Sequence, residues 1–390
     1  MGFLSGSMTF ECFRIGGTQP RQFGPEHVDL LKQHAIGESK SFSNEQARVG
    51  FLAGNHLLDD AFDLEKNVFG DALHFAVRID TNQVPAAIRR AWLQIELAML
   101  TADSPGRRPT KVQRQEAKDA VEARCEDAAR TGQFQRMQQF PVLWDAKDGL
   151  LYCGGTSASA SEVCAELLLK AFELELSRLS AGKLALEWAT KAKQRRALND
   201  AVPANFRGDG VRAEVAWWDG EGDNYDFLGN EFLLWLWWRW ETQGDAIQLP
   251  DDSEVTGMFA RTLSLECPRG ESGKGTFSAE DPTSLPEAAQ AIRSGKLPRK
   301  AGLILVHHGQ QYDLTLQAET FAVSGAKIQA DEEAEGREIL ESRIESLRGL
   351  KEALDLLFQA FCERRIGDSW SDDLEQMQGW LKAKPRSRRA

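Results

Sequence analysis

The run Pro109-Thr-Lys-Val-Gln-Arg-Gln-Glu-Ala-Lys-Asp-Ala-Val-Glu-Ala-Arg124 lies in the first third of a 390-residue chain. It is rich in helix-forming residues, contains no glycine, and opens with a proline, which helices accept at their first position, N1. We therefore predict a helix with Pro109 at N1. Lys111, Arg114 and Lys118 stand at i, i+3 and i+7 and share one face. The apolar residues of the run are few and small, so this helix is expected to bury little and to project.

The charge of this region is opposite to that of the whole chain. Residues 107–136 contain eight basic and five acidic side chains, a balance of +3, and the last nine residues add five cations and no acid. The net charge of the whole chain is −12, so the residues outside these two regions carry a net charge of −20. A localised basic patch of this kind is typical of a site for a polyanion such as nucleic acid.

The same charges also fit an ordinary solvated helix. Lys118 and Glu122 are four residues apart, and such pairs stabilise exposed helices without any ligand. Charge alone leaves both interpretations open.

The composition is that of a globular protein. Hydrophobic residues make up 42% and charged residues 27%, and a chain of this length is expected to form two or three compact units. No apolar run approaches the roughly 20 residues that cross a bilayer, and the N-terminus lacks a cationic segment followed by an apolar one. We therefore expect a cytoplasmic protein without membrane contact. Its six scattered cysteines form no Cys-x-x-Cys pair, which argues against a disulfide framework and a structural zinc site.

Sequence patterns on both sides of the cationic run predict an α+β region. Residues 72–80 have the pattern of a strand and residues 85–101 that of a helix. Two short strands, 141–145 and 150–153, flank the turn Ala-Lys-Asp-Gly, and a helix over residues 157–179 is expected to pack on this sheet. The cationic run is thus inserted between a helix and a hairpin.

A second α+β region is expected from about residue 181, with strands at 261–267, 301–307 and 311–318. Residues 333–364 form a long amphipathic pattern in which Leu340, Leu347, Leu354 and Phe361 repeat every seven residues. This repeat predicts a core or dimer helix.

The segment Phe232-Leu-Leu-Trp-Leu-Trp-Trp-Arg-Trp240 is unusually rich in tryptophan. Exposed tryptophans could stack on nucleic-acid bases. Because the segment is so apolar, we favour packing inside the second region over a binding platform.

Motifs for catalysis and metal binding are incomplete. Gly270-Glu-Ser-Gly-Lys-Gly-Thr276 lacks the first glycine of a phosphate-binding loop and the Ser or Thr after its lysine. The acidic segment 219–226 lacks the spacing of a calcium loop, and His307 and His308 are adjacent on an expected strand and point to opposite faces. No nucleophile and base motif is recognisable. We therefore expect no enzyme activity, no cofactor and no metal site.

The order of these pieces resembles the bacterial recombination-associated protein RdgC family. The resemblance is strongest over residues 70–180, through the strand leading into Pro85-Ala-Ala-Ile-Arg-Arg, the basic helix, and Trp144-Asp-x-x-x-Gly149-Leu-Leu. It returns weakly in Asn230-Glu-Phe-Leu-Leu-Trp-Leu, in residues 288–296, and in the strand and C-terminal helix that follow.

The resemblance implies an α+β fold of mixed sheets with packed helices, a projecting basic helical arm, and a ring-shaped homodimer. Members of the family bind DNA with little sequence preference through a positively charged central hole, and they restrain the RecA recombinase. Phosphate contacts suffice for such binding. This chain would then be nucleoid-associated, with DNA, a second copy of itself and a RecA-type recombinase as partners.

The resemblance also implies which residues contact DNA. The basic run of the family falls on Arg107, Arg108, Lys111, Arg114 and Lys118, and its exposed finger aromatic falls on Phe134. Arg130 and Arg136 flank Phe134 and could clamp phosphates. A dimer contact made by Phe134 remains the alternative, because aromatic residues are enriched at interfaces.

These expectations divide the chain into four parts. Residues 1–180 form an N-terminal α+β region with the arm 107–139 inserted, residues 181–330 a second α+β region, residues 331–381 a helical region, and residues 382–390 a basic tail. The chain is longer than the common family form and adds the tryptophan-rich and acidic segments. An alternative function is therefore a protein-interaction factor of a defence or mobile-element system that keeps the fold without encircling DNA.

Overall fold

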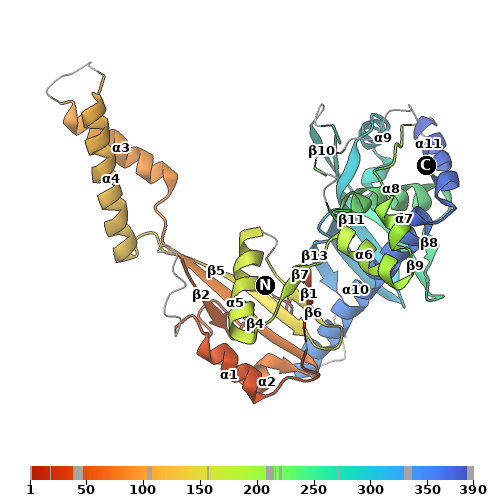
Figure 1. Ribbon diagram of the computed structural model, residues 1–390, viewed down its shortest axis with the longest axis horizontal. Coiled ribbons are helices and arrows are strands. Elements are labelled where there is room, and N and C mark those ends of the chain that lie inside the picture. Colours follow the sequence, from red (N-terminus) through yellow and green to blue (C-terminus); the bar gives the residue numbers. More distant parts are fainter. Residues whose placement is uncertain are drawn as a thin grey trace.

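The computed structural model describes residues 2–17, 19–37, 47–102, 108–155, 158–207, 215, 217–218, 222–269, 273–328 and 336–383. The expected α+β class is confirmed. The strand ladders formed within this part of the chain are antiparallel, and they join into one sheet. Figure 1 shows helices packed on this sheet and one pair of helices standing away from it.

The N-terminal half is built on one antiparallel sheet. Its strands are β1 (Met8–Ile15), β2 (Ala47–Leu52), β3 (Val68–Phe69), β4 (Ala72–Thr81), β5 (Arg136–Asp145), β6 (Leu150–Cys153) and β7 (Leu176–Arg178). Its helices outside the arm are α1 (Pro25–Gln33), α2 (Leu64–Asn67) and α5 (Ala158–Phe172). The predicted strand 72–80 and the predicted hairpin around residues 146–149 are confirmed, the latter by pairing of Val142 with Cys153 and of Asp145 with Leu150.

The helix predicted over residues 157–179 is too long. The α5 helix ends at Phe172, and Glu173 takes the left-handed backbone conformation, with φ 56°. This conformation cannot continue a right-handed helix. The chain then extends into β7, and Leu174 before this strand and Leu179 after it are buried without being part of the helix.

The arm consists of α3 (Ala86–Leu100) and α4 (Lys111–Thr131), inserted between the paired strands β4 and β5. Figure 1 shows both helices projecting beyond the end of that strand pair. The pair packs around a small cluster of its own, formed by Trp92, Val121 and Ala128. The predicted helix that buries little and projects is confirmed.

The C-terminal half surrounds a second part of the sheet. Its strands are β8 (Ala246–Gln248), β9 (Glu254–Glu266), β10 (Lys274–Ala279), β11 (Leu297–His307), β12 (Gln310–Gln317) and β13 (Val323–Ile328). Its helices are α6 (Ala181–Lys191), α7 (Arg195–Asn199), α8 (Phe227–Thr242), α9 (Pro286–Arg293), α10 (Arg337–Ile366) and α11 (Trp370–Lys382), with a 3₁₀ turn η1 (Pro282–Ser284). The three predicted strands and the long amphipathic helix are confirmed.

The tryptophan-rich segment forms most of α8 and lies inside the protein. Trp235, Trp237 and Trp238 are buried, and Trp237 packs on Phe259 of β9. Gly229 lets α8 approach the sheet, because a Cβ there would lie 1.8 Å from the carbonyl oxygen of Ala318. The prediction of core packing over a binding platform is confirmed.

The two halves are joined by backbone and side-chain bonds. The first strand, β1, pairs with β6 on one side and with β13 on the other. From α10, Arg348 donates two hydrogen bonds of 2.7 Å to the buried Asp145 carboxylate and one of 2.6 Å to Asp71. Arg343 donates to the carbonyl oxygens of Phe3 and Gly6. The strands of the two halves therefore form one sheet, in the order β10-β9-β11-β12-β13-β1-β6-β5-β4-β2, and α10 packs on both halves.

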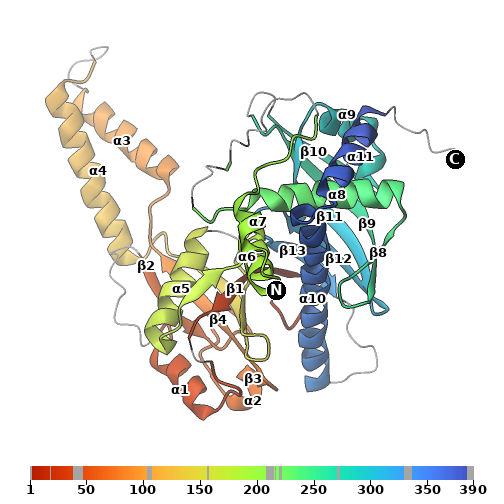
Figure 2. The same cartoon turned by 45° about the vertical axis from the view of Figure 1, so that its right-hand side comes forward.

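The outline of the chain is an open U. In Figure 1 the arm and the C-terminal half rise from opposite ends of the N-terminal sheet, and Figure 2 shows the same separation after a turn of 45°. Among the helices in the described ranges, none is both long and apolar enough to cross a bilayer.

Candidate nucleic-acid interface

Local sequence fixes both ends of the cationic helix α4. Thr110 is its N-cap: the Thr110 hydroxyl accepts a hydrogen bond from the Gln113 backbone N–H, and the Gln113 side chain accepts one from the Thr110 backbone N–H. Gly132 ends the helix in the left-handed conformation, with φ 73°. The expectation that Pro109 occupies N1 is wrong by two positions, because the stronger capping box places Lys111 there.

Contacts between α3 and α4 make the arm a unit. Arg89 pairs with Glu122 at 2.7 Å, and the Arg124 guanidinium lies 4.5 Å from the centre of the Trp92 ring. At the distal end, the Gln113 side chain donates to the carbonyl oxygen of Leu100 at 2.7 Å. Because an exposed ion pair contributes little, the Trp92 cluster is the main source of cohesion in the arm.

Most cations predicted to bind DNA are exposed and carry no acidic partner. These are Arg108, Lys111, Arg114, Lys118 and Arg136, none of which forms an ion pair with another residue that the structure describes. Lys118 does not pair with Glu122, which binds Arg89 of α3 instead. The i,i+4 pair of the solvated-helix interpretation is therefore not formed.

The structure gathers some of these cations and separates others. Lys111, Arg114 and Lys118 lie within about 60° of one another around α4, at 3.6 residues per turn. Arg130 is about 18 Å farther along the helix axis than Lys118, at 1.5 Å per residue. Arg136 opens β5 at the base of the arm, next to Thr81 of β4. Arg107 lies outside the described residues.

Arg130 differs from the other predicted contacts. Its guanidinium pairs with Asp127 at 3.0 Å, and both side chains are largely exposed. Such an exposed ion pair is weak. A phosphate that bound Arg130 would replace Asp127 and leave the Asp127 carboxylate without this partner.

The expectation that Phe134 is an exposed aromatic is wrong. Phe134 is half-buried and packs against the Trp92 ring, with 6.1 Å between the ring centres. It follows Gly132, where the chain turns back from α4 toward β5, and the turn folds its side chain onto the cluster within the arm. In the single chain Phe134 holds the segment after α4 against Trp92 of α3.

The sequence reasoning missed a second basic group. It spans the end of α6 and the start of α7 and consists of Lys191, Lys193, Arg195 and Arg196, all exposed. Only Arg195 of these four has an acidic partner among the residues described, Asp223 at 3.4 Å. The signal was present in the sequence as four cations within six residues.

The cations of α4 are exposed on a helix surface, and groups of this kind are able to contact phosphates without reading sequence. Elsewhere in the described chain, no cluster of three or more His, Cys, Asp or Glu side chains is arranged to hold a metal ion.

Comparisons with known proteins add no assignment. A scan against protein-family models finds no match, and a search of curated proteins finds no similar sequence.

Proposed function

We propose that this protein is a non-sequence-specific binder of double-stranded DNA that acts as a homodimer at the nucleoid. In this role it modulates homologous recombination by limiting the access of a RecA-type recombinase to DNA. The proposal unites the resemblance to the RdgC family with the charges of the arm.

The unpaired cations of α4 carry the proposal. The chain has a net charge of −12, yet Lys111, Arg114 and Lys118 share one exposed face and have no acidic partner in the described part of the structure. A surface that has not neutralised its own cations is available to phosphates, and binding to phosphates alone is indifferent to base sequence.

The shape and the distal end of the arm support a dimer. Ile95, Met99 and Val112 are 46%, 67% and 75% exposed, and they lie where α3 ends and α4 begins. Exposed apolar groups of this kind mark protein contacts. Two U-shaped chains that met through their arms and through their C-terminal halves would enclose a central space lined partly by the arm cations.

The same apolar residues favour a second candidate, the protein-interaction factor. In that case Ile95, Met99 and Val112 contact a different protein and the arm cations help to orient it. The two functions differ in whether the purified protein binds DNA without any other component.

The first experiment measures DNA binding by fluorescence anisotropy with unrelated duplexes at several salt concentrations. We expect similar affinity for each sequence and a linear fall of log affinity with log salt. Changing Lys111, Arg114 and Lys118 to Ala should lower the affinity and reduce the slope by up to about 2.7, at about 0.9 for each phosphate that is no longer neutralised.

The control is a triple variant that removes the same charge elsewhere, with Arg21, Lys183 and Lys327 changed to Ala. These three residues are also exposed. Equal losses in the two triple variants would mean that only net charge matters and would remove the arm from the binding site. Absence of binding by the wild type at low salt would contradict the DNA-binding function and leave the protein-interaction factor.

A further inference from the structure

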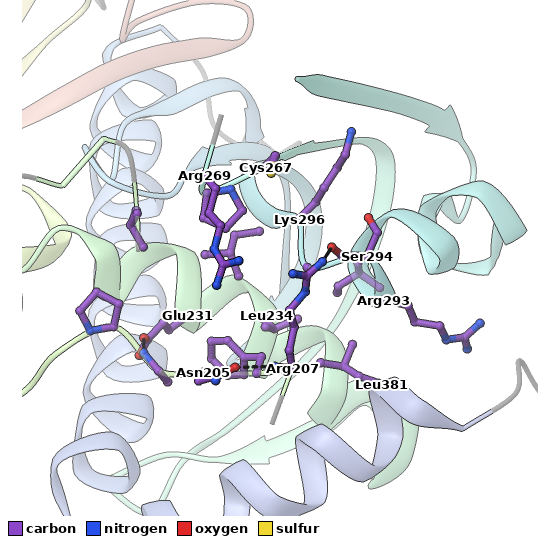
Figure 3. A pocket seen from close by; sticks show the side chains of 18 of the residues that line it. Asn205, Arg207, Glu231, Leu234, Cys267, Arg269, Arg293, Ser294, Lys296 and Leu381 are labelled. Atoms are coloured by element: carbon purple, nitrogen blue, oxygen red, sulfur yellow. Dashed lines mark hydrogen bonds between the residues drawn. The ribbon is translucent and has the colours of Figure 1, made fainter. Parts of the chain in front are cut away.

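A second candidate site lies in the C-terminal half, far from the arm. It is a cavity of about 620 Å³ between α8, α9, the end of α11 and the segment 203–207. Figure 3 shows the side chains that surround it. Cavities of roughly 300–1,000 Å³ are the usual size for small-molecule sites.

The cavity has an apolar wall formed by residues of the core. Phe227 and Leu234 come from α8, Ile292 from α9 and Leu297 from β11, and all four are buried in the fold. Because α8 and β11 pack directly on each other, this wall is held by the main core and needs no ligand to form. It offers a preformed surface for an apolar group.

Two guanidinium groups face the cavity from opposite sides. In Figure 3 the side chain of Arg269 points into the space above Leu234 and that of Arg207 rises beside the same space toward Ser294, whereas Arg293 and Lys296 point away from it. Arg269 is half-buried and has no hydrogen bond or ion pair with any residue in the described part of the chain. None of the described residues therefore satisfies its charge.

The position of Arg207 is fixed by backbone. Arg207 donates a hydrogen bond to the carbonyl oxygen of Ser294, at the C-terminal end of α9, where a helix favours a cation. Gly295, with φ 91°, makes this possible, since a Cβ there would lie 2.5 Å from the Arg207 side chain. One N–H group of the Arg207 guanidinium is thus used by the protein, and its other N–H groups have no acceptor among the described residues.

The acidic residue of the cavity is already neutralised. One Glu231 oxygen accepts from Arg365 at 2.5 Å and the other from the Ala204 backbone N–H at 2.7 Å. Glu231 therefore does not compensate Arg269, and the cavity keeps an excess of positive charge beside an apolar wall.

We propose that this cavity binds a small amphipathic anion, with an aromatic or aliphatic body on the Phe227 and Leu234 wall and one carboxylate or phosphate group between Arg269 and Arg207. Arg269 is the principal anion contact, because guanidinium groups bind both kinds of oxyanion through paired hydrogen bonds. The site is independent of the proposed DNA binding by the arm.

The test uses two fluorescent dyes with the same rings. 8-Anilinonaphthalene-1-sulfonate is an anion, and N-phenyl-1-naphthylamine is its neutral counterpart. We expect the full-length protein to bind one molecule of the anionic dye at this site. Its affinity should be at least about tenfold higher than that of the neutral dye, because only the sulfonate can accept charge-assisted hydrogen bonds from Arg269. Arg269→Gln should remove this difference, and Arg269→Lys should keep part of it.

The matched control is Arg293→Gln, which removes a cation that lines the same cavity but points away from it. It should leave the affinity for the anionic dye unchanged. The distal apolar residues of the arm can also bind naphthalene rings, but that binding would not depend on Arg269.

Equal affinities for the two dyes, or equal effects of the Arg269 and Arg293 variants, would overturn the site. Competition with decanoate and with decyl phosphate distinguishes a carboxylate from a phosphate head group, and displacement by neither would also overturn it. Duplex binding by Arg269→Gln should match the wild type. A parallel loss of DNA affinity would mean that Arg269 belongs to the DNA surface instead.

Discussion

At the scale of single residues, His74 is the most unusual buried group of the N-terminal half. It lies on β4 with 2% of its surface exposed, and neither ring nitrogen has a hydrogen-bond partner among the described residues. Gly54, with φ 111°, leaves room for the ring, since a Cβ there would lie 2.7 Å from His74 Cε1. Burial lowers the pKa of His74 from 6.5 to about 4, against a weaker raising effect of Asp59.

This burial predicts a pH-dependent stability. The unfolded chain protonates His74 near pH 6.5 and the folded protein only near pH 4, so the stability that the neutral ring contributes is complete above pH 6.5. It is lost as the pH falls from 6.5 to 4 and amounts to about 3 kcal/mol. We expect the unfolding free energy of the wild type, measured by urea denaturation, to fall between pH 6.5 and pH 4 by about 3 kcal/mol more than that of the His74→Phe variant.

The exposed His56 provides the control for this measurement. His56→Gln removes a histidine from the loop beside Gly54 without removing a buried ring, so its stability should follow the wild-type pH profile. If the unfolding free energy of His74→Phe depended on pH as that of the wild type does, the burial of His74 would not be coupled to its protonation.

At the scale of elements, the arm is an insertion that the sheet does not need. The β4 and β5 strands remain paired up to Thr81 and Arg136, and the arm has its own small cluster around Trp92. The antiparallel ends of such a pair can be closed by a two-residue Asn-Gly turn. The arm contributes little burial to the main core.

Replacing residues 82–135 by Asn-Gly should therefore leave a cooperatively folding protein. We expect its thermal midpoint within about 2 °C of the wild type, which corresponds to about 1 kcal/mol for a chain of this length, and at least tenfold weaker duplex binding under the DNA-binding proposal. Circular dichroism and anisotropy measure the two effects. Loss of the cooperative transition would show that the arm is part of the main fold, and full DNA affinity would place the binding site elsewhere.

At the scale of the whole molecule, the distal end of the arm carries exposed apolar residues that no other described part of the single chain covers. Under the proposed function, Ile95 and Met99 are covered by a second copy. Light scattering of the wild type should give a mass near twice the 43.5 kDa of one chain. The double variant Ile95→Asp and Met99→Asp should shift the mass toward the monomer, because burying two carboxylates opposes association.

The matched variant changes Leu58 and Leu169 to Asp. These leucines are 66% and 51% exposed and belong to the segment before α2 and to α5, outside the arm, so the dimer mass should persist. A monomeric wild type at micromolar concentration would contradict the homodimer, and equal dissociation of both variants would contradict a contact at the arm.

Much of the local structure could be predicted from residue patterns. The run after Pro109 predicts α4 because helix formers continue without interruption to Arg124 and beyond. The hairpin of β5 and β6 and the heptads of α10 were equally clear. Local predictions failed where a single backbone angle decided the outcome, as at Glu173, whose left-handed conformation ends α5 early.

Partners distant in sequence could not be predicted. Glu122 pairs with Arg89, 33 residues away, and not with Lys118 on its own helix. Arg348 binds Asp145 across 203 residues, and β1 joins strands from both halves of the chain. Each of these ion pairs and strand pairings depends on which groups the packed elements bring within hydrogen-bonding distance.

The sequence by itself determined four of the helices, α3, α4, α5 and α10, about half of the strands, the localised positive charge and the burial of the tryptophan-rich segment, because periodicity and composition act over neighbouring residues. Only the tertiary structure decided which arm cations remain unpaired, why Phe134 packs on Trp92, and where Arg207 and Arg269 meet an apolar wall. These features require segments far apart in the chain to lie side by side, and the free energy that selects among such contacts comes from packing the whole molecule.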